Sequence, residues 1–152
     1  MLSVTRCYAF SAAHRLFVRG WDDGRNDQAF GKCARPEGHG HNYRLEVTVC
    51  GTPDPETGLV ADRTGLDRVV RAEVLDRLDH RDLLPVLRAA GYATATSENV
   101  CRWILDRLST AAPGLPIRKV GLRETERNRF EIVRPCAEPP RRGEGPASPP
   151  KR

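Results

Sequence analysis

The segment HGHNYRLEVTVC, which runs from His39 to Cys50, decides the fold because apolar and polar residues alternate along most of it. Such a period of two is typical of a β-strand with one buried and one exposed face. The segment therefore predicts a strand over residues 43–50. The buried side would carry Tyr43, Leu45, Val47 and Val49, and the other side would carry Arg44, Glu46 and Thr48.

The same alternation, extended backwards, places His39 and His41 on the buried side, since residues two apart in an extended chain point the same way. Two neutral imidazoles on one side can chelate Zn²⁺ at about 2.0–2.1 Å. His14, in the segment FSAAH, is a candidate third ligand. Three protein nitrogens leave a fourth position for water or substrate, as in catalytic zinc sites. Ordinary hydrogen-bonded histidines remain the alternative to a metal site.

The remaining periodicities complete an α+β pattern. Further strands are predicted over residues 4–10, 59–61, 117–124 and 129–134, with loops over 20–31 and 51–58. Apolar residues at helical spacing predict helices from Thr64 to Leu78 and from Ser97 to Leu108, and Asp67 forms a capping-box pattern with Thr64. Strands grouped in this order predict an antiparallel sheet with two helices on one face.

Length and composition indicate one globular domain. The chain has 152 residues, 39% of them hydrophobic, and a net charge of +5. We expect a folded domain over residues 1–137 and a disordered tail over 138–152, because the tail has five prolines and no large apolar side chain. No apolar run reaches 18 residues and no signal peptide is recognisable, so we expect a cytosolic protein without a membrane partner. Basic and aromatic residues do not interleave, so the charge fits an anionic small molecule and no nucleic-acid partner is expected.

The five cysteines include no C-x-x-C pair, which favours reduced thiols. Cys33 lies in a polar loop beside Lys32, Arg35 and the candidate cation site, where positive charge would lower the pKa of its thiol. It is therefore a candidate nucleophile, general base or fourth metal ligand. The other cysteines of the predicted strands and helices are interpreted as packing residues: Cys7, Cys50 and Cys101.

Two acidic positions stand out. Asp79 and His80 end the first predicted helix and could act as a proton relay if the helix stops at Leu78; a solvated helix terminus is the alternative. Glu124 shares the parity of the apolar residues before it, and a lone buried carboxylate is costly. It is either exposed beyond the strand end or paired with two N–H donors, such as those of a guanine-like ring. Nearby helix-cap residues could also contact a ligand: Thr96, Ser97 and Glu98.

Five short motifs, taken together and in order, resemble the 6-pyruvoyl tetrahydropterin synthase family, which includes the 6-carboxytetrahydropterin synthase of queuosine (7-deazaguanine) biosynthesis. The likeness covers residues 4–134. The motifs are FSAAHRL at 10–16, GKCARPEGHGHNY at 31–43, LDHRDL at 78–83, TSENV at 96–100 and RET at 123–125.

The resemblance implies a tunnelling fold: a four-stranded antiparallel sheet with two helices, trimers that close a barrel, and a homohexamer with active sites between subunits. It also implies 7,8-dihydroneopterin triphosphate as the substrate. The implied roles are zinc binding for His14, His39 and His41, general base for Cys33, proton relay for Asp79 and His80, and pterin binding for Glu124 with Thr96, Ser97 and Glu98.

Within the resemblance two activities remain open. Five residues separate Cys33 from His39, a spacing similar to the 6-pyruvoyl enzymes; a 6-carboxytetrahydropterin synthase is the alternative. Two remoter hypotheses are a non-catalytic zinc protein, in which Cys33 completes a four-ligand site, and a nucleic-acid-binding protein that uses the basic tail.

Overall fold

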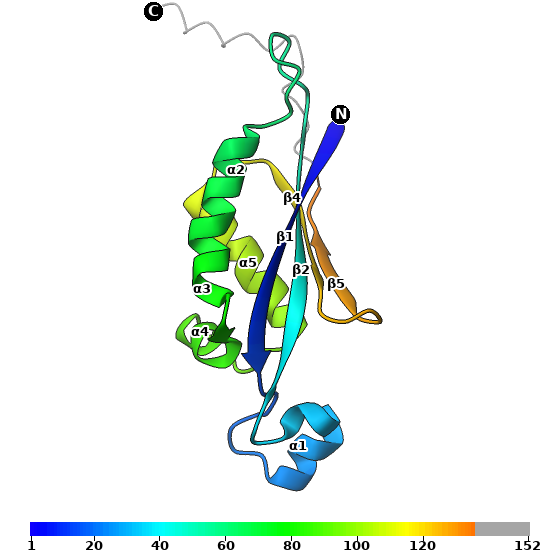
Figure 1. Ribbon diagram of the computed structural model, residues 1–152, viewed down its shortest axis with the longest axis vertical. Helices are drawn as coiled ribbons and strands as arrows, with labels where there is room; N and C mark the ends of the chain where they lie inside the picture. The colour runs from blue at the N-terminus through cyan, green and yellow to red at the C-terminus, as the bar shows by residue number, and fades with distance from the viewer. Residues whose placement is uncertain (136–152) are drawn as a thin grey trace, which may run out of the picture.

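The computed structural model describes residues 1–135, which form one five-stranded sheet with helices against one face (Figure 1). The strand order is β3-β1-β2-β4-β5. The strands are β1 (Leu2–His14), β2 (His39–Gly51), β3 (Arg81–Asp82), β4 (Ile117–Arg123) and β5 (Arg129–Val133). The helices are α1 (Asp23–Phe30), the 3-10 turn η1 (Gly31–Ala34), α2 (Arg63–Val70), its π-helical continuation η2 (Arg71–Leu75), α3 (Asp76–Leu78), α4 (Leu83–Ala89) and α5 (Ser97–Ala111). The α+β prediction is confirmed.

The longest feature is the antiparallel hairpin of β1 and β2, each of 13 residues. Its register runs without interruption from Leu2 opposite Gly51 to His14 opposite His39. The connection between the two strands carries α1 and η1, which lie beyond the main body at the end of the hairpin (Figure 1). The predicted strand over 43–50 is thus correct but longer, and it extends back through both histidines.

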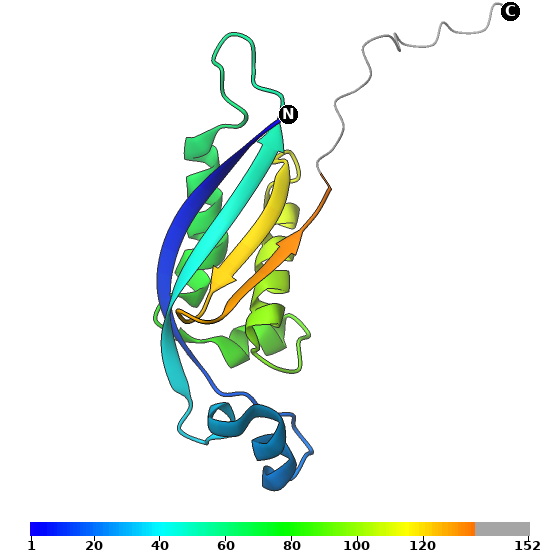
Figure 2. The same cartoon turned by 90° about the vertical axis from the view of Figure 1, so that its right-hand side faces the viewer.

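The core lies between the sheet and the paired helices α2 and α5, while the other sheet face carries no helix (Figure 2). The alternating residues predicted to be buried are almost fully inaccessible, each at most 1% exposed. The apolar residues of the helices that face these side chains are buried too. Each large aliphatic side chain transferred from water contributes roughly 1.5–3 kcal/mol. The inward side chains are Tyr43, Leu45, Val47 and Val49 from β2, Leu66, Val70, Val74 and Leu78 from α2–α3, and Val100, Ile104 and Leu108 from α5.

The sheet differs from the prediction at two places. It has five strands rather than four, because Arg81 and Asp82 pair parallel to Ala12 and Ala13 of β1. The strand predicted over 59–61 does not form. The carbonyl of Leu59 instead accepts a hydrogen bond from the Asp54 amide at 2.9 Å, which closes a local turn.

Two helices were missed. The predicted loop over 20–31 contains α1, where the Asp22 side chain caps the helix by accepting from the Arg25 amide. Its one buried residue is polar: Asn26 accepts a hydrogen bond from the Val18 amide at 2.8 Å. Because α1 buries no apolar stripe, periodicity could not reveal it. The short helix α4 begins at a similar cap, Asp82.

The first predicted helix is correct in extent, but its start is not a capping box. Asp62 is the N-cap residue and Thr64 lies inside the helix. The Asp67 carboxylate points away from the helix end to β1, where it accepts hydrogen bonds from the Arg6 guanidinium at 2.6 and 3.0 Å and from the Tyr8 hydroxyl at 2.7 Å. The predicted capping role of Asp67 is wrong because its carboxylate is bound in an ion pair with Arg6, a residue far away in the sequence.

Cys50 and Cys101 are buried, as the interpretation as packing residues predicted, whereas Cys7 is exposed and that interpretation is wrong for it. The expectation of reduced thiols is wrong for Cys50, which is disulfide-bonded, while Cys7, Cys33 and Cys101 are free. The predicted tail over 138–152 and its boundary with the domain lie outside the described residues. Within residues 1–135, no helix is long and apolar enough to cross a membrane.

We expect Asp67→Asn to lower the free energy of unfolding by about 0.5–1 kcal/mol at pH 7, since the half-exposed ion pair is screened by solvent. Arg6 and Tyr8 lower the pKa of the Asp67 carboxyl through hydrogen bonds. A lowered folded-state pKa gives stability that is present above the unfolded-state pKa and lost as the pH falls through the folded-state value. Urea unfolding of both proteins between pH 7 and pH 3 should therefore show a difference that shrinks below about pH 4. An equal difference at both ends would contradict the ion-pair account.

Candidate functional site

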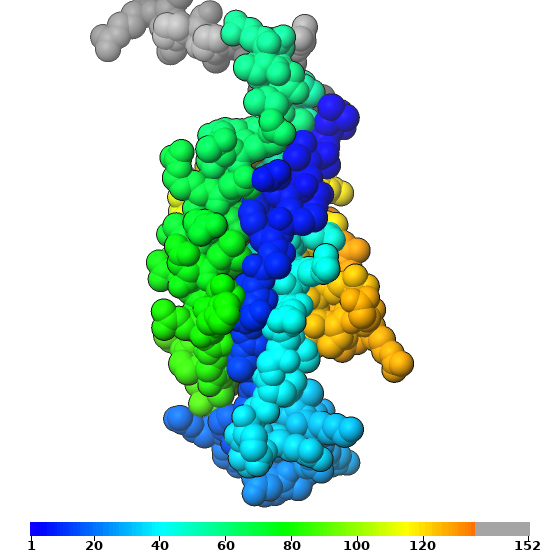
Figure 3. Space-filling model, viewed as in Figure 1, coloured from blue at the N-terminus to red at the C-terminus, as the bar shows by residue number. Residues whose placement is uncertain are grey.

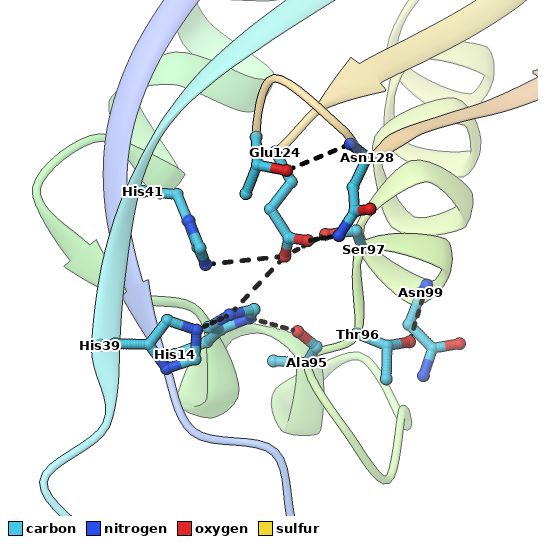
Figure 4. A network of polar contacts seen from close by, with 10 residues as sticks. His14, His39, His41, Ala95, Thr96, Ser97, Asn99, Glu124 and Asn128 are labelled. Carbon is cyan, nitrogen blue, oxygen red and sulfur yellow. Dashed lines mark hydrogen bonds and ion pairs between the residues drawn. The ribbon is translucent and has the colours of Figure 1, made fainter. Parts of the chain in front are cut away.

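Three imidazoles meet where the β1–β2 hairpin leaves the body of the molecule (Figure 4). His14 ends β1 directly opposite His39, and His41 follows two residues along β2 on the same side. One nitrogen from each ring can be chosen so that all three lie within 4.8 Å of one another. The Nε2 atoms of His14 and His39 are 3.1 Å apart. The prediction that these three histidines converge on one side of the sheet is confirmed.

The environment of the rings suits a metal. The Nδ1 atom of His14 contacts the Ala95 carbonyl oxygen at 2.9 Å, which fixes the ring and turns Nε2 toward the cluster. The Nε2 atom of His41 is buried with no hydrogen-bond partner in the described chain. Burial lowers the pKa of both His39 and His41, which favours the neutral ligand form. A tetrahedral zinc ion would separate two nitrogens by roughly 3.3 Å, close to the observed 3.1 Å.

Glu124 lies beside the three histidines, immediately after the end of β4. Its side chain is only 12% exposed, and Oε1 is 3.7 Å from Nε2 of His14 and 3.8 Å from Nε2 of His41. The Ser97 hydroxyl donates to Oε1 at 2.8 Å, and the Asn128 amide reaches Oε2 at 3.5 Å (Figure 4). The carboxylate thus points to the apolar side, as its parity predicted, but it has polar neighbours from four segments.

The three residues at the start of α5 that were predicted to contact a ligand have different surroundings. Thr96 is the N-cap and accepts from the Asn99 amide at 3.4 Å, while Ser97 is buried and bonded to Glu124. Glu98 is exposed and lines a separate small cavity beside Cys101 and Phe130. Among these three, Ser97 is the residue whose side chain hydrogen-bonds Glu124, and Glu98 faces elsewhere.

Cys33 is half-buried on η1, on the segment that joins the two hairpin strands. Burial, and secondarily the negative charge of Glu124, raises the pKa of its thiol. Lys32 and Arg35, which are both exposed to solvent, do not outweigh these two effects in the protein alone. The expected lowering of the pKa also depends on a cation at the neighbouring histidines and stays a prediction.

Asp79 and His80 are arranged as a relay, and neither belongs to the cluster of three histidines, although His41 and His80 line the same cavity. The helix ends at Leu78, so the two side chains can meet: Nδ1 of His80 is 3.0 Å from Oδ1 of Asp79, which also accepts from the Ser11 amide at 2.8 Å. His80 has a φ of 56°, the one positive φ of a non-glycine residue in the described chain. A backbone in this region is strained by about 1–3 kcal/mol and is commonly found at functional sites. Its imidazole is 82% exposed and lines a cavity with Ser11 and Asn42.

The sequence analysis missed a functional candidate, Tyr43, which it placed simply in the core. Tyr43 is fully buried, stacks on Phe10 with ring centroids 4.9 Å apart, and contacts the ring of His41 edge-on at 5.6 Å. Its hydroxyl has no hydrogen-bond partner in the described chain, and burial with the charge of Glu124 raises its pKa. Its position two residues after His41, on the same face, was the available signal.

These features define a cluster of three histidines that could hold a metal ion, next to a nearly buried carboxylate. Comparison with known proteins then gives the family. Residues 3–135 match the family described as 6-pyruvoyl tetrahydropterin synthase. A Pongo abelii protein named 6-pyruvoyl tetrahydrobiopterin synthase is 39% identical over 82% of this chain and 86% of its own length. An Archaeoglobus fulgidus relative, provisionally named 6-carboxy-5,6,7,8-tetrahydropterin synthase, is 34% identical over 83% of this chain and 90% of its own.

The solved structure of Caenorhabditis elegans 6-pyruvoyl tetrahydropterin synthase superimposes with a TM-score of 0.81 at 35% identity, over 88% of this chain and 96% of that one. The chain therefore belongs to the 6-pyruvoyl tetrahydropterin synthase family, a family of pterin synthases that are lyases.

We expect Tyr43→Phe to leave the free energy of unfolding unchanged or to raise it by up to about 1 kcal/mol, because a buried hydroxyl without a partner is costly. The matched control is Tyr8→Phe, which removes a hydroxyl bonded to Asp67 and should destabilise the fold. Urea unfolding of the two variants measures the contrast. An equal loss of stability in both would show that the Tyr43 hydroxyl is bonded after all.

Proposed function

We propose that this protein is a zinc-dependent 6-pyruvoyl tetrahydropterin synthase, which acts on 7,8-dihydroneopterin triphosphate and eliminates triphosphate. One observation carries the proposal: Glu124 lies 3.7–3.8 Å from two of the three histidines. A pterin ring bound to this carboxylate would project its side chain toward the histidine cluster. Family membership, the relatives' names and the spacing of Cys33 and His39 support the same assignment.

Glu124 would bind the ring by accepting two N–H hydrogen bonds, the bidentate geometry that carboxylates favour. The Ser97 hydroxyl holds Oε1 in place, so the carboxylate is oriented before the ligand arrives. His14, His39 and His41 would hold the zinc ion, with the His14 ring fixed by Ala95. When bound, zinc would supply Lewis-acid polarisation of the substrate's side-chain hydroxyls.

Cys33 would act as the base that takes a carbon-bound proton from the substrate side chain. Transfer of a proton from the hydroxyl-bearing carbon next to the ring to the ring itself would turn that alcohol into a ketone while the C=N bond of the dihydropterin is reduced, so the tetrahydropterin forms without an external reductant. Loss of the proton beside the triphosphate-bearing carbon would then allow the carbon–oxygen bond to triphosphate to break, and the resulting enol would tautomerise to the second ketone of the pyruvoyl group. Since burial and Glu124 raise the pKa of Cys33 in the protein alone, positive charge in the histidine cluster is needed to favour its thiolate. Asp79 would hold Nδ1 of His80 and leave Nε2 free to exchange protons in the tautomerisation.

The exposure of His80 supports assembly into a homohexamer, a dimer of trimers. Its imidazole is 82% exposed, and the cavity that it lines with His41 includes neither Cys33 nor Glu124, so a second copy would supply the relay. Both edges of the sheet offer backbone for pairing: β5 is the last strand, and β1 is covered by β3 at only two residues. Heterologous contacts of this kind close into rings. A cytosolic location and the absence of a nucleic-acid partner remain predictions from the sequence.

A 6-carboxytetrahydropterin synthase is the second candidate, favoured by the Archaeoglobus relative. This reaction would release acetaldehyde as well as triphosphate. The non-catalytic zinc hypothesis is less favoured, because within residues 1–135 the ligand cluster contains three histidines and does not include Cys33.

Incubation of the zinc-loaded protein with 7,8-dihydroneopterin triphosphate should give a 6-pyruvoyl product without acetaldehyde, detected by mass spectrometry and an aldehyde assay. A 6-carboxy product with acetaldehyde would assign the alternative activity. If the substrate returned unchanged while zinc was confirmed in the protein, the proposed function would be wrong.

Mixing two inactive variants tests the shared site. Cys33→Ser and His80→Gln should each retain zinc and lose turnover. If Cys33 and His80 act from different copies, hetero-oligomers reassembled from equal amounts of the two variants should regain about a quarter of the parental activity. The reason is that about a quarter of the sites would combine an unchanged Cys33 from one copy with an unchanged His80 from another. Recovery of less than a few per cent, with mixed assembly confirmed by native mass spectrometry, would place the relay elsewhere.

A further inference from the structure

The sheet face that no helix of residues 1–135 covers can be seen in Figure 2. The strand register places a row of arginines on this face, one on each of three neighbouring strands. Arg44 of β2 pairs with Arg123 of β4, which in turn pairs with Arg129 of β5. Side chains directly opposite one another on antiparallel strands have Cβ atoms about 4.5–5.5 Å apart, and like charges in such pairs are destabilising. The row therefore requires negative charge nearby.

The protein supplies only part of that charge. Arg129 pairs with Glu46 at 2.6 Å, and Arg123 pairs with Glu126 at 2.8 Å, although the Glu126 side chain is 86% exposed. The side chain of Arg44 has no ion pair or hydrogen bond with any residue from 1 to 135, and neither has that of Arg127 in the β4–β5 turn. Two guanidinium groups thus remain available.

These arginines border a hollow of about 600 Å³. On the β1 side, small side chains border the hollow and leave space above the sheet. Ala9 lies opposite Arg44, and Cys7 lies opposite Glu46. Four arginines and two glutamates line it, so the excess charge is positive. The polar and small lining residues are Cys7, Ala9, Arg44, Glu46, Arg123, Glu126, Arg127 and Arg129.

We propose that this hollow, the arginine hollow, binds a small polyphosphate anion, with Arg44 and Arg127 as its principal ligands. The guanidinium group matches phosphate oxygens through paired N–H donors. The volume lies within the range of about 300–1,000 Å³ that is typical of small-molecule sites. A nucleic-acid strand is disfavoured, because the one aromatic ring in the lining, Tyr8, hydrogen-bonds Asp67 and the hollow offers no stacking platform.

The arginine hollow is distinct from the histidine site. Arg123 and Glu124 are consecutive, and their side chains leave the sheet on opposite faces: Arg123 lies in the arginine row, whereas Glu124 contacts Ser97 and the histidines. Binding in the hollow therefore does not depend on the proposed reaction, although that reaction would release a suitable ligand, triphosphate.

The test is calorimetric titration of the zinc-loaded protein with inorganic triphosphate at fixed ionic strength. Arg44→Gln and Arg127→Gln should each weaken binding by about tenfold, the loss expected for a charge-assisted contact. Arg71→Gln, on the helical side of the molecule, is the matched control and should change affinity less than twofold. Neopterin, which carries no phosphate, should bind Arg44→Gln as it binds the parent, and this result separates the arginine hollow from the pterin site.

Circular dichroism checks that Arg44→Gln folds; without ligand it should be at least as stable as the parent, because a repulsive neighbour is removed. Equal weakening by Arg44→Gln and Arg71→Gln, or no triphosphate binding by the parent, would overturn the proposal. So would an oligonucleotide that bound more tightly than triphosphate and lost that affinity in Arg44→Gln.

Discussion

The structure depends first on the register of the β1–β2 hairpin, which sets His14 opposite His39. Because side chains alternate along a strand, a slip of one residue would turn one of these imidazoles to the other face of the sheet and leave the cluster incomplete. The buried residues that follow on β2 oppose such a slip, since every one of them would exchange core for solvent. The same apolar alternation that folds the sheet therefore also positions the three histidines that we propose as metal ligands.

Two other segments complete the site. The end of β4, the strand that pairs with β2, contributes Glu124, and the start of α5, which covers the sheet, contributes Ser97, whose hydroxyl holds the carboxylate (Figure 4). The two faces of the sheet carry different polar groups. The three imidazoles and the carboxylate lie on the helix-covered face, and the arginines lie on the other face. In the space-filling view the green helical segments cover the left flank of the hairpin strands (Figure 3).

Much of this could be predicted from the sequence, and the misses share a cause. Period-two alternation located β2 and the parity of His39 and His41, and the parity of β4 located Glu124. The helix α1 was missed because its buried residue is polar, and Asp67 was misassigned because its partners are 59 and 61 residues away. Burial, and secondarily Glu124, raises the pKa of the Cys33 thiol in the protein alone, and local sequence showed the two basic neighbours of Cys33 but not this burial. Local periodicity predicts elements and faces, whereas tertiary contacts decide partners.

The central claim is that three imidazoles and no thiolate hold the metal. X-ray absorption at the zinc edge of the loaded protein tests it most directly. The account predicts three imidazole nitrogens and a light oxygen ligand at about 2.0–2.1 Å. A sulfur ligand at about 2.3 Å would contradict it, because Cys33 would then close a structural site and could not serve as the base.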